Sequence, residues 1–226
     1  MDFVNACKEG RLDIVMELAK NGVDIHAENE FGFRWACCKG HLEVVKYLMS
    51  LDDKPNIHAE NEEGFRSACF YEHLEVIKYL MEQEDKPNIH AENEYGFRSA
   101  CLNGRLELIE YLMLLDDKPD VHAENEHGFR SACCNGHLEV IKYLMEQDDK
   151  PYTHAENEYG FRLACRNGHL EVIKYLMEQD DKPDIHAENE QGFLWACLNG
   201  HLEVVKYLTT LCDEYEIVID ENGKLI

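Results

Sequence analysis

The chain has 226 residues, of which 45% are apolar, so it holds enough core-forming side chains for one large domain or two small ones. Its 46 acidic residues outnumber the 22 Lys and Arg residues, which gives a formal charge of −24. A surface of this charge repels nucleic acids and anionic membranes, and no basic run offsets it, so neither is expected as a partner. No stretch approaches the roughly 20 apolar residues of a membrane span.

The first residues, Met1 to Asn5, lack the basic start and apolar core of a secretion signal. The sequence therefore predicts an intracellular protein, in the cytoplasm or alternatively the nucleus. The ten cysteines are expected to be reduced thiols in such a compartment.

The first 25 residues predict a pair of short helices. Phe3, Ala6 and Cys7 share one helical face, and Gly10 suits a helix stop. The same pattern returns 30 residues later, from Phe33 onwards.

From residue 26 the sequence is a repeat. The segment His-Ala-Glu-Asn-Glu recurs every 32 residues, starting at His26, His58, His90, His122, His154 and His186. Each copy leads into a first predicted helix, usually Gly-Phe-Arg-x-Ala-Cys, a second one such as His-Leu-Glu-Val-Ile-Lys-Tyr-Leu, and a loop such as Asp-Asp-Lys-Pro. Helices of about ten residues bury their apolar stripes only by stacking on neighbours. The fold class is therefore all-α, a solenoid of seven stacked helix pairs over residues 1–212.

These motifs resemble the ankyrin repeats. Leu18 to Ala27 is similar to that family's helix end and following turn, and Asn-Gly-His-Leu-Glu-Val is similar to its second-helix motif. The Thr-Pro-Leu-His motif is absent, so the resemblance implies that the family's β-hairpin fingers are shortened or lost. The Gly-Phe-Arg variant looks most like ankyrin proteins of giant DNA viruses, which implies a viral protein acting in host cytoplasm.

The titratable residues of the repeat form ladders, one rung per helix pair. Successive histidines of His-Ala-Glu-Asn-Glu cannot share a zinc ion, because packed helices lie roughly 8–10 Å apart and Zn–N bonds are about 2 Å. We expect each imidazole to hydrogen-bond backbone of its turn or the next layer. The same spacing excludes disulfides between the buried small residues Cys37, Cys69 and their equivalents, whereas Cys38 and Cys134 point toward the surface.

Two further ladders are expected to be structural. Arg34 and its equivalents should pair with the glutamates of His-Ala-Glu-Asn-Glu, and Tyr47 and its equivalents should be half-buried spacers. A catalytic site needs a unique asymmetric cluster, and the titratable residues are mostly copies of one another. The sequence therefore predicts no enzyme, no metal and no cofactor.

The residues that escape the repeat predict a binding surface. They lie on one stripe of the first helices, opposite the constant Phe, Ala and Cys, and in ankyrin proteins the first helices line the concave face. The stripe is richer in aromatic side chains than a solvated face requires, with neutral drift as the alternative. The candidate partner-binding residues are Phe31, Trp35, Phe70, Tyr71, Tyr95, Leu102, His127, Tyr159, Arg166 and Trp195.

The predicted function is a non-catalytic module that binds a protein partner through this face. The acidic loops indicate either solubility or a basic protein partner. The alternatives are a structural or assembly component of a virion or oligomer, and a substrate-recognition adaptor for a degradation machine.

Glu72, at a position otherwise held by glycine, is expected to be a strained helix stop costing about 1 kcal/mol.

The last residues leave the repeat. A β-branched run, Ile217 to Ile219, precedes Asn222-Gly223, which is a hairpin signal. Residues 213–226 are therefore predicted to form a short β-type tail, either a cap on the last helix pair or a strand edge for a partner.

Overall fold

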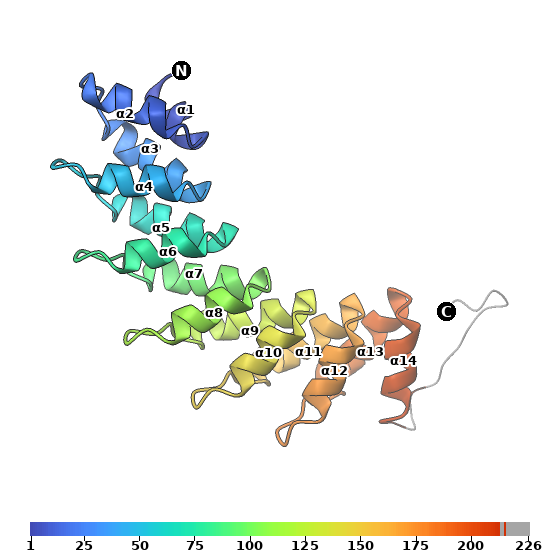
Figure 1. Cartoon of the computed structure of the whole chain (residues 1–226). Coiled ribbons are helices and arrows are strands. Elements are labelled where there is room, and N and C mark those ends of the chain that lie inside the picture. Colours follow the sequence, from blue (N-terminus) through green and yellow to red (C-terminus); the bar gives the residue numbers. More distant parts are fainter. Residues whose placement is uncertain (213–214, 216–226) are drawn as a thin grey trace. The chain divides into compact units, whose positions relative to one another are not determined.

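The computed structural model describes residues 1–212 and Tyr215, and these residues contain fourteen α-helices and no strand (Figure 1). The first helices of the seven pairs are α1 (Phe3–Lys8), α3 (Ala27–Cys38), α5 (Ala59–Tyr71), α7 (Ala91–Leu102), α9 (Ala123–Asn135), α11 (Ala155–Asn167) and α13 (Ala187–Leu198). The second helices are α2 (Leu12–Lys20), α4 (Leu42–Met49), α6 (Leu74–Met81), α8 (Leu106–Met113), α10 (Leu138–Met145), α12 (Leu170–Met177) and α14 (Leu202–Thr209). The predicted all-α class with seven pairs is confirmed. The predicted hairpin lies outside the described residues.

The chain divides into two compact units, which we describe separately. The N-terminal unit comprises residues 1–100 and 110–119, and the C-terminal unit comprises residues 101–109 and 120–226. In the N-terminal unit α3 packs between α1 and α5, and α4 packs between α2 and α6 (Figure 1). In the C-terminal unit α11 packs between α9 and α13, and α12 packs between α10 and α14. Each unit is thus a stack of helix pairs.

The core consists of the residues that the repeat keeps constant. The rings of Phe33, Phe65, Phe97, Phe129 and Phe161 are each 1% exposed, and the Ala three residues after each is fully buried. The cysteine ladder is buried from Cys7 to Cys165 and half-buried at Cys197. Burial raises the pKa of the Cys7 thiol to about 12, because the thiolate loses its hydration. Tyr47 and its equivalents are half-buried, as predicted.

Each first helix from α3 to α13 opens with a left-handed turn that the sequence analysis did not predict. In α5 the residues Glu60, Asn61 and Glu62 have φ angles of 52°, 52° and 65°, and the same three positions are left-handed in every other copy. Left-handed geometry costs an L-residue about 1–2 kcal/mol. The right-handed part of the helix therefore begins after this turn, and something must compensate for the turn's cost.

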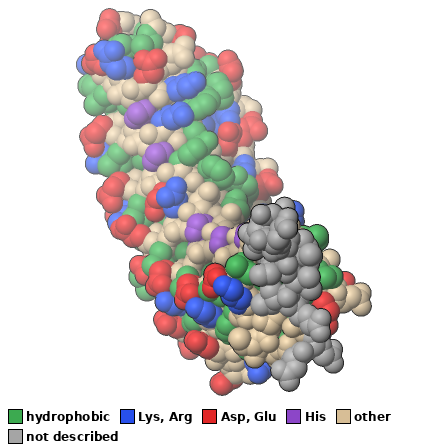
Figure 2. All heavy atoms as spheres, turned by 90° about the vertical axis from the view of Figure 1, so that its right-hand side faces the viewer, with side chains coloured by type: hydrophobic (Ala, Val, Ile, Leu, Met, Phe, Trp, Pro, Cys, Tyr) green, Lys and Arg blue, Asp and Glu red, His purple; other side chains and the backbone are tan. Residues whose placement is uncertain are grey.

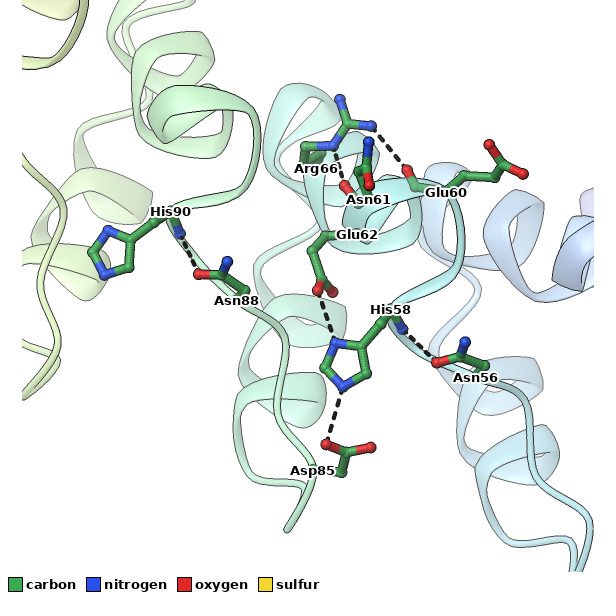
Figure 3. A network of polar contacts seen from close by, with 9 residues as sticks. All are labelled: Asn56, His58, Glu60, Asn61, Glu62, Arg66, Asp85, Asn88 and His90. Atoms are coloured by element: carbon green, nitrogen blue, oxygen red, sulfur yellow. Dashed lines mark hydrogen bonds and ion pairs between the residues drawn. The ribbon is translucent and has the colours of Figure 1, made fainter.

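Side chains of the repeat hold the turn in place (Figure 3). The backbone N–H of His58 donates to Asn56 Oδ1 at 3.0 Å. Arg66 donates from Nε to the carbonyl of Asn61 at 2.6 Å and from its NH2 group to the carbonyl of Glu60 at 3.1 Å. The prediction that the arginines pair with the carboxylates of His-Ala-Glu-Asn-Glu is wrong, because the left-handed turn aims its carbonyls at the guanidinium instead.

The first histidine ladder also differs from the prediction, because its partners are carboxylates rather than backbone. In Figure 3 the His58 ring lies between Glu62 of its own layer and Asp85 of the next loop, at 2.7 and 3.0 Å. Equivalent rings at positions 26, 90, 122 and 154 lie 2.6–2.9 Å from the layer's own Glu and 2.7–3.2 Å from the next loop's Asp. An ionised carboxylate only accepts hydrogen bonds, so two such partners require both ring nitrogens to donate, which favours the charged imidazole.

A second histidine ladder connects neighbouring layers through backbone. Nε2 of His41, His73, His137, His169 and His201 lies 2.8–3.0 Å from a carbonyl of the preceding first helix. Each of these rings rests against the glycine that ends that helix. Where the helix stop is Glu72, which is left-handed with φ 60° as predicted, the corresponding second helix begins with Arg105 in place of histidine.

Candidate protein-binding surface

The predicted partner-binding residues all lie on first helices, and none is fully buried. Tyr71, Leu102 and Arg166 are exposed, with 52% of Tyr71 and 39% of Leu102 accessible. The other seven residues are half-buried. The middle of the predicted stripe is less accessible, since Ser99, Ser131 and Leu163 are buried. The surface is therefore a series of local clusters within each unit.

The first cluster is a hollow on α3 and α5 of the N-terminal unit. It is lined by Phe31, Arg34, Trp35, Cys38, Glu63 and Ser67. The rings of Phe31 and Trp35 meet edge to face, with centroids 5.9 Å apart. The guanidinium of Arg34 lies 5.1 Å from the Phe31 ring and donates to the Glu63 carboxylate.

A second hollow adjoins the first, because Glu63 and Ser67 line both. Its other lining residues are Arg66, Phe70, Tyr71 and Tyr95. The rings of Phe70 and Tyr71 also meet edge to face, at 5.0 Å. The structure thus brings five of the predicted residues together in the N-terminal unit: Phe31, Trp35, Phe70, Tyr71 and Tyr95.

Lysine ammonium groups surround these rings. Lys8 Nζ lies 4.4 Å from the centroid of Trp35, and Lys39 Nζ lies 5.5 Å from Trp35 and 5.8 Å from Tyr71. These are cation–π distances. On the face drawn in Figure 2, hydrophobic side chains of the upper part, which holds the N-terminal helices, have Lys and Arg side chains beside them.

The C-terminal unit carries a smaller cluster around Trp195. The guanidinium groups of Arg162 and Arg166 lie 5.9 and 5.4 Å from its ring, and Arg162 also lies 5.1 Å from the ring of Tyr159. Leu198 beside this cluster on α13 is 82% exposed.

The predicted residue His127 lies on a different helix, α9. Its Nδ1 atom is 3.3 Å from the hydroxyl of Ser131.

Two of the predicted tyrosines also have a role within the stack. Arg66 lies over the Tyr95 ring of the next layer at 5.4 Å, and Arg130 lies over Tyr159 at 5.6 Å. In other layers this arginine meets Glu63 or Gln191 at the same position. The position held by Glu63, Tyr95, Tyr159 and Gln191 therefore contacts the arginine of the layer before it. Because these tyrosines have that role within the stack, Trp35 and Trp195 are better markers of a binding surface.

Sequence reasoning missed Lys8 and Lys39 as members of the surface. Both stand at variable positions: other copies have Cys, Phe, Leu or Arg where Lys8 stands, and Glu, Tyr or Asn where Lys39 stands. That departure was the available signal. By itself this departure does not indicate a binding surface, because a single exposed lysine is ordinary on the surface of a protein.

Metal-ligating side chains do not gather among the described residues. No three His, Cys, Asp or Glu side chains among them are grouped so as to hold a metal ion. In the same part of the chain, no helix is both long enough and apolar enough to cross a bilayer.

Comparison with known families agrees with the geometry of stacked helix pairs. A family model described as ankyrin repeats, in three copies, matches residues 3–93, 34–125, 97–187 and 129–222. The chain therefore belongs to the ankyrin-repeat family. The sequence has no match among curated proteins. Ankyrin repeats are protein–protein interaction modules and are generally not enzymes.

Proposed function

We propose that this protein binds a protein partner through the first-helix clusters, above all the joined hollows around Trp35. The observation that carries the proposal is that both tryptophans of the chain lie half-buried on first helices, at positions that the repeat does not require. A core position would bury them, and a merely solvated face does not favour large aromatic side chains. Tryptophan and tyrosine are the residues that most often dominate the energy of protein interfaces.

The distribution of charge supports a partner with basic regions that reach the loops. The loops after the second helices carry exposed acid pairs such as Asp52 and Asp53, and in Figure 1 those after α4 and α6 project from one side of the N-terminal unit. The field of the chain's excess negative charge would steer a partner of net positive charge toward it. Added salt should then lower the association rate constant and change the dissociation rate constant much less.

The resemblance to ankyrin proteins of giant DNA viruses belongs to the same proposal. It rests on the Arg before the first-helix Ala and on the Gly-His-Leu-Glu-Val-Val-Lys-Tyr-Leu phrase, and it supports a proposal in which the partner is met inside a host cell. The virion component and the degradation adaptor differ from a simple binding module only in what the partner is. Identification of the partner therefore decides among them.

The proposal is tested by capture of partners with the full-length chain, followed by mass spectrometry and by affinity measurements on purified partner. Trp35→Ala and Tyr71→Ala should each weaken binding, together by about 2 kcal/mol or more, because aromatic anchors carry much of an interface's energy. For the exposed Tyr71 the melting temperature should stay close to that of the original protein, since changes on an exposed face alter stability by no more than about 0.5 kcal/mol.

The matched control is Tyr47→Ala, which removes a half-buried ring from a second helix. It should affect stability more than binding. If the Trp35 and Tyr71 variants bind with unchanged affinity, the first-helix clusters are not the binding surface and the proposal is refuted.

A further inference from the structure

We infer that the joined hollows of the N-terminal unit bind an acidic peptide segment, whose carboxylates meet Lys8 and Lys39 and whose apolar side chain enters between Trp35 and Tyr71. The inference rests on the proposed function and specifies which chemistry docks on that surface. It holds for a segment of the partner, whatever the partner's net charge.

Lys8 and Lys39 carry charges that the protein itself does not neutralise. Both side chains are exposed, and among the described residues no carboxylate lies within ion-pair distance of either ammonium. The lysines of the second helices behave differently, since Lys46 Nζ lies 3.1 Å from Glu43 and Lys78 Nζ lies 3.3 Å from Glu75. The two lysines around Trp35 are therefore available to an anionic partner.

The charge of the hollows is opposite to that of the protein as a whole. Lys8, Arg34, Lys39 and Arg66 line the hollows or lie over their rings, against a single carboxylate, Glu63. That carboxylate already accepts a hydrogen bond from Arg34. In a chain with a charge of −24, a local excess of cations at an aromatic surface favours an anionic segment at that place.

The arrangement of the rings around Ser67 suits an apolar side chain of the peptide. Ser67, a small residue, lines both hollows, and aromatic rings stand on either side of it, Trp35 in one and Phe70 and Tyr71 in the other. Lys39 lies over both Trp35 and Tyr71 and so bridges the two sides. An inserted apolar side chain would gain contact with the rings, and flanking carboxylates would then reach the ammonium groups, which makes charge-assisted hydrogen bonds.

The C-terminal unit repeats this combination with different residues. Trp195 also has two cations within 6 Å, and Arg166, one of them, is exposed on α11 with no ion pair to a carboxylate in the described chain. Arg166, like Lys8, stands where other copies have Cys, Phe or Leu. Both tryptophans of the chain thus have a cation that the repeat does not supply.

A nucleic acid would also offer anionic groups and stacking bases, but it fits less well. A polyanion that tracks several phosphates needs a continuous basic groove. Here the cations are confined to the rings, and the same unit has exposed acids such as Glu9, directly after α1, and Glu43 on α4. A short segment with a few carboxylates meets the cations without approaching the remaining acidic surface.

The test is selection of binders from a library of random 12-residue peptides on the immobilised full-length chain, followed by affinity measurements with the selected peptides. Selected sequences should combine Asp or Glu with a Leu, Phe or Trp. The double variant Lys8→Glu with Lys39→Glu should weaken binding of these peptides at least about tenfold. The double variant Lys8→Arg with Lys39→Arg should retain it.

The matched control is Lys46→Glu with Lys78→Glu, which changes the net charge equally but lies on second helices. It should weaken binding by no more than about threefold, through long-range repulsion alone. Equal losses in the two Glu double variants, selected peptides without acidic residues, or comparable binding of a 12-nucleotide oligodeoxythymidine would each overturn the inference.

One outcome separates this inference from the proposed function. If Trp35→Ala weakens binding while the Lys8 and Lys39 charge reversal does not, the first-helix surface binds partners but not through their carboxylates. If neither change affects the bound peptides, the proposed function is refuted together with the inference.

Discussion

At the scale of the residue, the glycine that ends each first helix meets two requirements. Gly168 has a φ of 78°, which L-residues avoid, and a Cβ built on it would lie 2.5 Å from Nδ1 of His201. Gly200, at the same position in the last layer, has a φ of 74° but has no atom within 4 Å of such a Cβ. The two glycines therefore separate the cost of backbone geometry from the cost of the clash.

We predict that Gly200→Ala lowers the free energy of unfolding by about 1 kcal/mol, the cost of left-handed geometry alone. Gly168→Ala should cost on the order of 2–4 kcal/mol, because displacement of the His201 ring adds an overpacking cost. Urea denaturation of the two variants measures the difference. Combining Gly168→Ala with His201→Ala should remove much of the excess, and equal costs for the two glycines would show that the ring adapts freely.

One first helix stops at Glu72 instead of at glycine. In the sequence, Arg105 stands where the next second helix would begin with histidine. The strained stop could be predicted from the sequence. The contact between a glycine stop and a histidine 33 positions later, as between Gly168 and His201, could not, because only the structure shows that the histidine rests on the glycine of the preceding layer.

At the scale of the element, the left-handed turn stores backbone strain in six copies. Glu28, the first of the three left-handed residues in α3, has a φ of 55° and an exposed side chain. Glycine adopts this geometry without steric cost but loses more conformational entropy on folding. The two effects oppose each other, and the steric cost of about 1–2 kcal/mol is the larger.

We therefore predict that Glu28→Gly leaves the free energy of unfolding unchanged or raises it by up to about 1 kcal/mol. The control is Glu17→Gly in α2 of the same unit, where Glu17 is exposed and right-handed, and glycine should cost about 1 kcal/mol. Chemical denaturation compares the two. A loss at Glu28 as large as that at Glu17 would contradict the left-handed assignment.

The same element makes stability depend on pH through the first histidine ladder. Hydrogen bonds to Asp85 and Glu62 raise the pKa of His58 above its ordinary value, and those to Asp181 and Glu158 do the same for His154. Partial burial lowers the pKa of His90, yet its bonds to Glu94 and Asp117 raise it overall. A folded-state pKa above the unfolded value of about 6.5 stabilises the fold fully below pH 6.5, and this stabilisation is lost as pH rises through the folded value.

We predict that the protein is less stable at pH 9 than at pH 6. The buried thiols do not titrate in this window, since burial raises the pKa of Cys7 to about 12 and also raises the pKa of the other buried cysteines. The urea midpoint measured at intervals between the two pH values reports the effect. Replacing both His58 and His90 by Gln should flatten the dependence, because the pKa of both rings is raised in the folded state. A midpoint independent of pH would show that the rings are not held as cations.

The helices were predictable from the sequence, and the turn that joins the layers was not. Apolar residues three and four apart, together with the glycine stops, indicate helices because they follow from local periodicity. A run of three left-handed L-residues contradicts local propensity and depends on bonds from Arg66 and His58 that lie outside the run. For the same reason the aromatic residues of the binding surface could be chosen from the sequence, but Lys8 and Lys39 required the geometry.

At the scale of the whole molecule, each layer depends on its neighbours, so a terminal layer must differ from the others. The last one does: Leu194 stands where five earlier layers have arginine, and Phe193 is half-buried rather than buried. Tyr215 compensates in part. Its ring stacks on Phe193 with centroids 4.1 Å apart and planes at 15°. Its hydroxyl lies 3.2 Å from the Ile185 carbonyl and donates to the Glu190 carboxylate.

We predict that Tyr215→Ala destabilises the last helix pair by about 1–3 kcal/mol, the value of a partly buried stacked ring with its hydrogen bond. Because stability in a repeat protein propagates from layer to layer, hydrogen exchange should quicken in α13 and α14 and stay unchanged in α1 to α4. Tyr215→Phe, which retains the ring, should lose less. Deletion of residues 213–226 should lose at least as much as Tyr215→Ala, and any excess measures what the rest of the tail adds. If exchange in α13 is as slow in the truncated chain as in the full one, the tail does not cap the stack, and a partner-binding role for it becomes the better hypothesis.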